Sequence, residues 1–368
     1  MTVENVNSFF DEWAPKSIAW EKDNVGLQVG SLSSRVKGIV VALDATEQVV
    51  EEARMKKANL LVTHHPLLFN PVRTVTDRNA TGRCIAALVR GGISLYSAHT
   101  NLDFTRGGTS FALAEILGLR DVDFLSHSYR IGRKVVTFVP SLNVEKVATA
   151  MARAGAGRIG NYKECSFQTE GTGIFRGNEE SRPAVGKKHA RETVKETRLE
   201  MVAPVWKVDN VIKAMKESHP YEEVAYDVYP LENTSSDFGM GAIGNLEKPL
   251  TMQAFIRRVK RNLHIPAVRS SSIPRKNVRR IAVCGGSGSA LTQDAVRAGA
   301  DVFVTADVKY HSFHDADQRI AVVDAGHYET EIPVMRVVVE RLRTWLREHD
   351  SGIPVHLART ITNPVTYV

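Results

Sequence analysis

Two segments near opposite ends of the chain share one residue pattern, and this internal repeat constrains the fold more than any other feature. VKGIVVALDATEQVVEEARMKKANLLVTHH covers residues 36–65, and VRRIAVCGGSGSALTQDAVRAGADVFVTAD covers residues 278–307. Each reads as an apolar strand, a loop, a helix of about ten residues, a turn and a second apolar strand ending in threonine. Strand–helix–strand order predicts parallel strands joined by right-handed crossovers, in a sheet covered by helices.

The parallel between the two ends continues after the second strand. Residues 93–103 (ISLYSAHTNLD) and 320–331 (IAVVDAGHYETE) both read as a strand, a small residue and a histidine that an acid follows. A predicted helix precedes each copy, at residues 3–13 and 251–263. We therefore expect an α/β fold of two related halves that arose by internal duplication. The histidine and the acid are four positions apart in each copy: His99 and Asp103, His327 and Glu331.

The segment between the halves, residues 131–235, has a different pattern. Two predicted helices alternate with strands, which is typical of a ferredoxin-like α+β module. The polar stretch 178–192 is expected to be a mobile loop. The predicted elements are strand 133–140, helix 143–155, a hairpin over 162–177, strand 197–204, helix 205–219 and strand 223–231. The expected domains are the first half of the core at 1–130, the inserted module at 131–235 and the second half at 236–368.

The charge of the chain is moderately basic, with 48 Lys and Arg against 41 Asp and Glu, a formal charge of +7. An excess of basic residues can indicate a nucleic-acid partner. Here the basic residues are scattered, and their concentrations at 257–261 (RRVKR) and 275–280 (RKNVRR) fit a solvated helix face and a loop. We therefore do not expect a nucleic-acid partner.

Cysteine usage and apolar runs indicate the compartment. Cys84, Cys165 and Cys284 are far apart and form no C-x-x-C pair, which argues against a disulfide framework and a cysteine-based zinc site. No apolar stretch approaches the roughly 20 residues needed to span a bilayer. Residues 1–13 lack the basic and apolar regions of a signal peptide. We expect a cytoplasmic protein without a membrane partner.

Histidines and acids gather at the predicted carboxyl ends of the strands, where open parallel sheets bind ligands. Adjacent residues of a strand point to opposite faces, but Pro66 ends this strand, so His64 and His65 can turn toward one pocket and serve two neighbouring ions. His-x-x-x-Glu spacing places two ligands on one helix face, and Pro333 is expected in the first turn of that helix. The residues at these strand ends are His64 and His65, His99 with Asp103, His311, and His327 with Glu331.

Imidazoles mixed with carboxylates predict a site for Zn, Fe, Mn, Co or Ni rather than for Mg or Ca. A carboxylate can bridge two ions about 3.5–4 Å apart, and such a pair activates water for attack at phosphorus or carbon. A single histidine at a strand end is more often structural, so the prediction depends on the whole set. His99 is open among three roles, a ligand, an outer donor or a proton-transfer group, and His311 is an outer, catalytic or structural residue. We interpret His127, His189, His264, His314, His349 and His356 as surface or structural.

The glycine-rich segment GGSGSAL, residues 285–291, follows a predicted strand and opens a helix. Its backbone N–H groups can hold an anion at such a position. It lacks the third glycine of the G-x-G-x-x-G fingerprint, so a tight turn into the helix, with Ser289 as N-cap, is the favoured interpretation.

Several motifs together resemble the dinuclear-metal-centre family known as GTP cyclohydrolase 1 type 2 homologue, in its long form. Residues 160–177 and 219–231 resemble the PII/CutA-like domain that longer members insert. One departure is Ala306, where the family pattern has glycine. The core motifs are THHP (63–66), SAHTNLD (97–103), KYH (309–311), DAGHYETE (324–331), DNVGLQVG (23–30) and VCGGSGS (283–289).

The resemblance implies two intertwined α/β halves, a metal pair between them and a ring-shaped homohexamer capped by the inserted domains. The His99 position is not usually counted as a ligand in this family. A cyclohydrolase activity follows from resemblance only, and the chain has no recognisable guanine-reading motif. The ligands of the two divalent ions would be His64, His65, Asp103, His327 and Glu331.

The leading functional hypothesis is a metal-dependent hydrolase acting on a nucleotide or another phosphorylated small molecule, with His99 or His311 moving protons. Five side chains for two ions leave positions for water and substrate, whereas closed structural zinc sites have four protein ligands. The alternative is a non-catalytic metal-binding scaffold or regulatory protein whose inserted domain senses a small molecule, with HPYEE (219–223) as a polar candidate. A third hypothesis, a ring around DNA, has only the net positive charge in its favour.

Overall fold

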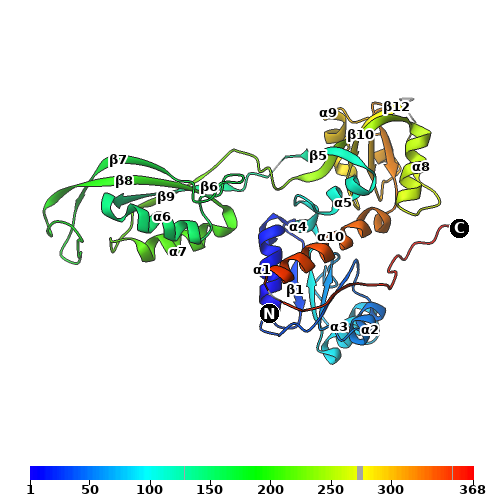
Figure 1. Cartoon of the computed structure of the whole chain (residues 1–368), viewed down its shortest axis with the longest axis horizontal. Coiled ribbons are helices and arrows are strands. Elements are labelled where there is room, and N and C mark those ends of the chain that lie inside the picture. The colour runs from blue at the N-terminus through cyan, green and yellow to red at the C-terminus, as the bar shows by residue number, and fades with distance from the viewer. Residues whose placement is uncertain (128, 272–276, 350) are drawn as a thin grey trace. The chain divides into compact units, whose positions relative to one another are not determined.

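The computed structural model of the chain describes residues 1–127, 129–271, 277–349 and 351–368. The chain divides into two compact units: a core unit of residues 1–127 and 236–368, and a middle unit of residues 128–235 (Figure 1). Residues 275 and 276 of the basic run at 275–280 lie outside the described residues. Within the described ranges, no helix has both the length and the apolar character needed to cross a membrane.

The first sheet of the core unit has five strands in the order β1-β4-β3-β2-β15. Strands β4, β3, β2 and β15 are parallel to one another, and β1 is antiparallel to β4 at the edge. Helix α2 (Glu47–Met55) connects β2 to β3, as the repeat at 36–65 predicted, and α3 (Ala80–Gly91), which was not predicted, connects β3 to β4. The strands are β1 (Gly26–Val29), β2 (Ile39–Ala42), β3 (Leu60–Thr63), β4 (Ser94–Ser97) and β15 (Val355–Leu357).

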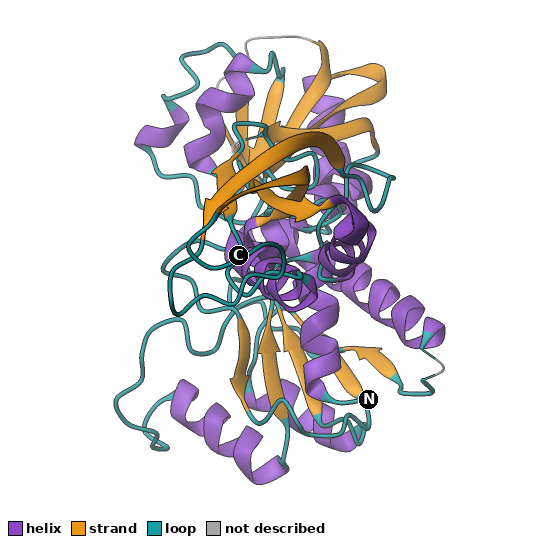
Figure 2. Cartoon of the chain, turned by 90° about the vertical axis from the view of Figure 1, so that its left-hand side faces the viewer, coloured by secondary structure: helices purple, strands orange, loops and turns teal. Residues whose placement is uncertain are grey.

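The apolar residues of these strands pack into two cores, one on each face of the sheet. Ile39 and Val41 belong to the core that contains α1 (Val3–Trp13) and α10 (His327–Glu348). Val40 belongs to the core formed with α2 and α3. Because successive side chains point to opposite faces, these continuous apolar strands require helices on both sides of the sheet. Figure 2 shows helices beside the strands in this arrangement.

The second sheet of the core unit has six strands in the order β11-β14-β13-β12-β10-β5. Its three central strands β12, β13 and β14 are parallel, and β10 and β11 flank them in antiparallel orientation. Helix α8 (Met252–Asn262) and α1 confirm the helices predicted at 251–263 and 3–13. The other elements here are β5 (Leu119–Ser126), β10 (Met240–Thr251), β11 (Arg269–Ser270), β12 (Asn277–Val283), β13 (Val302–Thr305), β14 (Ala321–Asp324), α5 (Thr109–Ile116) and α9 (Thr292–Arg297).

The two sheets exchange chain segments. Strand β5 precedes the middle unit in the sequence, yet it pairs with β10 in the second sheet. Strand β15 comes near the C-terminus, yet it pairs with β2 in the first sheet, whose core also contains α10. Shorter helical segments are α4 (Thr100–Asp103), η1 (Lys16–Ile18), η2 (Ser141–Asn143), η3 (Val205–Lys207), η4 (Ser289–Leu291) and η5 (His311–Phe313).

Helix α10 begins earlier than its proline suggested. It starts at His327, so Pro333 lies in its second turn, and the prediction that Pro333 marks the first turn is wrong. Gly326 has a φ of 86° and turns the chain into the helix, and its carbonyl accepts from the N–H of Thr330 at 3.1 Å. A proline inside a helix removes one backbone hydrogen bond. Burial of Thr330, Val334 and Val338 holds the helix together across that gap.

The middle unit is a four-stranded antiparallel sheet in the order β7-β8-β6-β9, with two helices in its core. The hairpin predicted over 162–177 is wrong, because β7 runs unbroken from Phe167 to Arg176. Gly171 and Gly173 weaken a strand locally, but β7 pairs with β8 along its whole length and stays one strand. The elements are β6 (Gly132–Pro140), α6 (Val144–Arg153), β7 (Phe167–Arg176), β8 (Arg191–Pro204), α7 (Val208–Ser218) and β9 (Tyr226–Pro230).

Candidate metal centre

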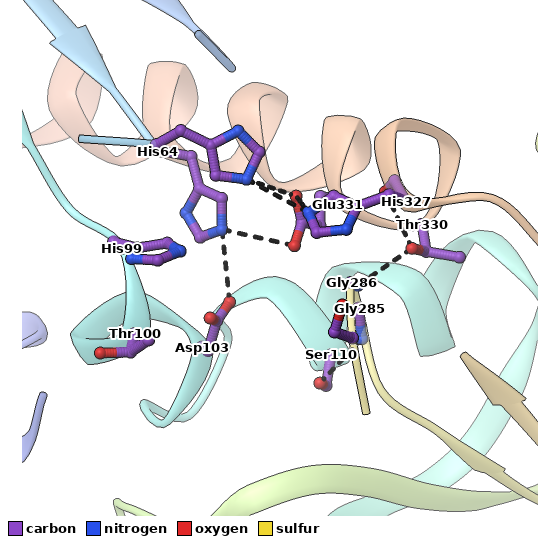
Figure 3. A network of polar contacts seen from close by, with 12 residues as sticks. His64, His99, Thr100, Asp103, Ser110, Gly285, Gly286, His327, Thr330 and Glu331 are labelled. Atoms are coloured by element: carbon purple, nitrogen blue, oxygen red, sulfur yellow. Dashed lines mark hydrogen bonds and ion pairs between the residues drawn. The ribbon is translucent and has the colours of Figure 1, made fainter. Parts of the chain in front are cut away.

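Three segments that are far apart in the sequence meet at one place in the core unit. Strand β3 ends immediately before the twin histidines, α4 follows β4, and α10 begins at the third segment. The carboxyl ends of parallel strands lie at one edge of a sheet, which brings the first two segments together. Figure 3 shows the polar side chains of these segments turned toward one another. The residues in question are His64, His65, His99, Asp103, His327 and Glu331.

The carboxylate of Glu331 is buried and lies among three imidazoles. Its Oε2 atom lies 2.9 Å from Nε2 of His65 and 3.1 Å from Nε2 of His327. Its Oε1 atom lies 3.8 Å from Nε2 of His64. His65, His327 and Glu331 each offer a ligand atom within 4.8 Å of the others, which is close enough to share one ion.

His64 and Asp103 form the other side of the centre. Nε2 of His64 lies 3.5 Å from Oδ1 of Asp103, and both atoms are buried with no hydrogen-bond partner among the described residues. Buried polar atoms without partners are costly. A cation between the imidazole nitrogen and the carboxylate oxygen would engage both lone pairs, so this pair fits a metal ion. His64, His65 and His99 form a second group with ligand atoms within 4.8 Å of one another.

In His65 and His327, the Nδ1 atom, which points away from the centre, is bonded to a carboxylate. Nδ1 of His65 lies 2.7 Å from Oδ1 of Asp44, and Nδ1 of His327 lies 2.6 Å from Oδ2 of Asp307. A neutral imidazole that donates from Nδ1 keeps its lone pair on Nε2. Carboxylates in this position orient metal-binding histidines and make them better ligands.

The other two imidazoles are oriented in the same way. Nδ1 of the fully buried His64 lies 2.8 Å from the backbone carbonyl of Ala98. Nδ1 of His99 lies 2.9 Å from Oδ1 of Asp23, whose Oδ2 accepts from the hydroxyl of Thr100 at 2.5 Å. In all four histidines, an oxygen acceptor on one nitrogen therefore leaves the other free to face the centre.

Burial and the neighbouring charges shift the pKa of His65, His327 and Glu331. Burial lowers the pKa of His65, but Asp44 and Glu331 outweigh burial and raise it to about 10. The hydrogen bond with Glu331, together with Asp307, raises the pKa of His327 to about 9 against the effect of burial. Burial raises the pKa of Glu331, yet the three imidazoles bring it well below its usual range. A metal ion must displace protons from these histidines, so metal binding here releases protons.

The two histidines predicted to be catalytic have different positions. His99 lies in the centre, with its ring centroid 5.2 Å from that of His64 and 5.6 Å from that of His65. His311 is exposed on η5, edge-on to the exposed ring of Tyr310, and it belongs to neither metal-binding group of the described residues. The structure brings His99 to the five ligand candidates and leaves His311 outside them.

Sequence reasoning did not find Asp23, Asp44 and Asp307, which hold the histidines. Asp307 had a detectable signal, because it occupies the position in the second repeat that His65 occupies in the first. Asp23 opens the motif DNVGLQVG, but nothing in that motif pointed to a histidine, and Asp44 belongs to none of the core motifs; both meet their histidines only through tertiary contacts.

The glycine-rich segment, residues 285–291, packs beside the centre through backbone hydrogen bonds to Thr330 of α10 and Thr305 of β13. The N–H of Gly286 donates to the hydroxyl of Thr330 at 3.0 Å, and the N–H of Gly288 donates to that of Thr305 at 2.9 Å. These donors are engaged within the chain rather than presented to an anion. Ser289 is not an N-cap, because Gly288 takes that position in η4 and no side chain caps it.

Known proteins match this chain along nearly its whole length. A protein of Halalkalibacterium halodurans named GTP cyclohydrolase 1 type 2 homolog is 38% identical over 367 residues, which cover 99% of this chain and 98% of that protein. A Bacillus subtilis protein of the same name is 37% identical over 367 residues, with the same coverage of 99% and 98%.

A solved structure gives the same result in three dimensions. The crystal structure of a Bacillus cereus protein related to NIF3 superposes with a TM-score of 0.86 at 38% identity, covering 100% of this chain and 99% of that one. The sequence profile of Duf34/NIF3 (NGG1p interacting factor 3) matches residues 1–364. The chain therefore belongs to the Duf34/NIF3 family.

Proposed function

We propose that the chain binds two divalent metal ions and hydrolyses a nucleotide or another phosphorylated small molecule. The observation that carries this proposal is that potential metal-ligand atoms converge on one place. Among the described residues, Nε2 of His64 and Oδ1 of Asp103 are buried there without a hydrogen-bond partner. Nδ1 of each converging histidine is already bonded to an oxygen, so Nε2 is the atom that faces the centre. Mixed imidazole and carboxylate ligands favour Zn, Fe, Mn, Co or Ni. The proposed ligands are His64, His65, Asp103, His327 and Glu331.

The distribution of ligands supports two ions rather than one. Glu331 directs one carboxylate oxygen at His65 and His327 and the other at His64. A carboxylate placed in this way can bridge neighbouring ions. A pair of divalent ions, when bound, supplies a water of lowered pKa and neutralises negative charge on a phosphorylated substrate.

The role proposed for His99 is to move a proton at Nε2. Asp23 holds Nδ1 of His99 at 2.9 Å, so the ring is fixed with Nε2 available. Asp23 is itself fixed by the N–H of Thr100 at 3.1 Å and by its hydroxyl, and its pKa is lowered to about 2, because these bonds and His99 outweigh the effect of burial. An ionised carboxylate accepts the Nδ1–H of the neutral ring, which leaves the lone pair on Nε2 to take up a proton.

The names of the relatives support a nucleotide as the substrate. The proteins of Halalkalibacterium halodurans and Bacillus subtilis are named as homologues of a GTP cyclohydrolase. Hydrolysis of a phosphate ester and hydrolytic opening of a purine both use an activated water, so a test must include both reactions.

Metal content and turnover of matched variants test this proposal. We expect gently purified wild-type protein to contain about two ions per chain by elemental analysis, and His65→Ala to lose metal and activity together. His349→Ala is the control, since His349 is exposed and, among the described residues, its side chain hydrogen-bonds only to the carbonyl of Trp345. The substrates are a panel of nucleotides, phosphomonoesters and esters.

Two results would contradict the proposal. Wild-type protein that purifies without bound metal would contradict the proposed metal centre. Metal-loaded protein that is inactive on the whole panel would contradict the hydrolase activity. That result would favour a metal-binding scaffold whose middle unit senses a ligand. Thermal stabilisation of such a protein by one metabolite would then identify that ligand.

Self-assembly into a homohexamer is part of the same proposal. Strand β7 pairs with β8 on one side, and none of the described strands covers its other edge. Phe167 and Ile174 of β7 are 65% and 56% exposed, which is unusual for an uncovered edge strand in a free monomer. Light scattering on the purified chain measures the mass, and a monomer would contradict the assembly.

A further inference from the structure

A cavity of about 370 Å³ opens beside the candidate metal centre in the core unit. His65 and His327 line it on the side of the centre. Arg269, Glu329 and Tyr367 line other parts of its wall. A substrate that reaches the metal ligands through this cavity must therefore lie against these residues.

Arg269 is anchored in the cavity wall by one end of its guanidinium. Its Nη2 atom donates to the carbonyl of Val308 at 3.0 Å and to the carboxylate of Asp324. The guanidinium carbon lies 5.6 Å from the ring centroid of Phe313. Among the described contacts, none engages Nε or Nη1 of Arg269, and the side chain is 63% exposed. The residue is thus held in place while part of its donor set stays available.

Each of the acids around the cavity has a donor that fixes its carboxylate, and Asp324 is paired with the cation of Arg269. Asp324 accepts from Arg269 and from the N–H of Val308 at 3.0 Å. Glu329 accepts from the side-chain amide of Asn363 at 2.8 Å. Divalent ions in the centre would add further positive charge to this cavity. Two more lining acids are engaged by histidines: Asp44 by His65, and Asp307 by His327.

We propose that Arg269 binds the phosphate of the substrate and so selects phosphorylated molecules for the metal centre. This inference rests on the proposed function, since it assigns the substrate class of that site. A guanidinium presents N–H donors in a plane that matches two phosphate oxygens, and it stays charged at all working pH values. Anchoring by Asp324 and Val308 reduces the conformational freedom that the side chain loses on binding.

Calorimetric titration of metal-loaded protein with inorganic phosphate, a nucleoside 5′-monophosphate and the corresponding nucleoside tests the assignment. We expect Arg269→Ala to weaken binding of the two phosphate-containing probes by roughly tenfold to a hundredfold, the range for a charge-assisted hydrogen bond. Nucleoside binding and metal content should not change. Arg269→Lys keeps the charge and can still pair with Asp324, and it should lie between the wild type and Arg269→Ala.

Arg297→Ala is the matched control, because Arg297 is 68% exposed and pairs with Asp294 on α9, away from the lining of the cavity. Equal phosphate affinity in Arg269→Ala, Arg297→Ala and the wild type would overturn the assignment. So would a wild type that binds the nucleoside and its monophosphate equally well. Inorganic phosphate cannot be hydrolysed, so its binding is measured independently of turnover. An Arg269-dependent phosphate affinity in a protein inactive on every substrate would contradict the hydrolase and leave the phosphate site standing.

Discussion

Nδ1 of His65 lies 2.7 Å from Oδ1 of Asp44, while Nε2 of the same ring lies 2.9 Å from Oε2 of Glu331. One imidazole thus joins a carboxylate outside the centre to the carboxylate in its middle. The relationship makes Asp44 a residue that positions a ligand without being one. The contribution of Asp44, which orients the ring, can therefore be tested by substitution separately from that of His65, which is the proposed ligand.

Asp44→Asn should weaken metal binding by roughly tenfold to a hundredfold, the usual effect of removing a carboxylate behind a metal-binding histidine. The amide keeps the shape of the side chain but not its charge, so the protein should remain folded. Competition of the metal-loaded variant with a chelator measures the change. Asp77→Asn, in an exposed loop, is the control, and equal chelator resistance in all three proteins would contradict the role of Asp44.

Gly286→Ala should destabilise the protein and lower its metal content together. Gly286 has a φ of 63°, and a Cβ there would lie 2.1 Å from Oε1 of Glu331. Gly299→Ala separates the two causes, because Gly299 has a φ of 71° with no atom within 4 Å of the added Cβ. Backbone strain alone should cost Gly299→Ala about 1 kcal/mol of unfolding free energy. Full metal content in Gly286→Ala would contradict a close contact with Glu331.

Glu52 should make stability depend on pH in the acid range. Its carboxylate accepts from Lys56 at 2.5 Å, from the N–H of Arg359 at 2.8 Å and from the N–H of Thr360 at 2.9 Å. Burial raises the pKa of Glu52, but these bonds lower it from 4.5 to about 2. A pKa lowered in the folded state stabilises the protein above the unfolded value, and this stabilisation is lost as the pH falls from about 4.5 to about 2.

Thermal unfolding of Glu52→Gln across this pH range measures the effect. The shift corresponds to a stabilisation on the order of 3 kcal/mol at neutral pH. The variant should therefore unfold at a lower temperature than the wild type at pH 7, and the difference should shrink toward pH 2. Glu51→Gln is the control, since Glu51 is exposed and Arg54 is its only ion-pair partner among the described residues. A difference independent of pH would show that the charge of Glu52 is not its cause.

Met215→Ala should destabilise the middle unit without emptying the metal centre. Met215 is fully buried in the core that α6 and α7 form on their sheet. Truncation of a buried methionine costs about 2–5 kcal/mol. Leu142→Ala, at a completely exposed position of the same unit, should change stability by less than about 0.5 kcal/mol. Denaturant unfolding with elemental analysis checks both, and loss of metal in Met215→Ala would show that the core unit depends on the middle unit.

The chain's repeat was enough to predict the strands on which the metal candidates sit. Apolar strands alternate with amphipathic helices, so parallel pairing of β2, β3 and β4 follows from local pattern and handedness. Parallel strands end at a common edge, and this rule placed His64 and His65 near His99 and Asp103. These residues could be predicted because both their side-chain chemistry and their position at the carboxyl ends of parallel strands indicate a metal site.

Other features depended on contacts between distant segments. Asp44 is an ordinary acid in a loop until its carboxylate meets His65, and Arg269 is an ordinary surface arginine until Asp324 anchors it beside the cavity. The exchange of β5 and β15 between sheets was likewise open, because a short strand can pair with any available edge. Strand β7 also stays continuous through its glycines because it pairs with β8 along its whole length.

The sequence by itself determined which residue types were available for metal chemistry and on which elements they lie. Local periodicity and spacing express the geometry of a single helix or strand, so they carry that information. Only the tertiary structure decided which nitrogen of each histidine faces the centre and which arginine faces the cavity. Those choices depend on contacts between residues far apart in the sequence, such as His99 with Asp23 76 positions away and Arg269 with Asp324 55 positions away, and no local pattern encodes such distances.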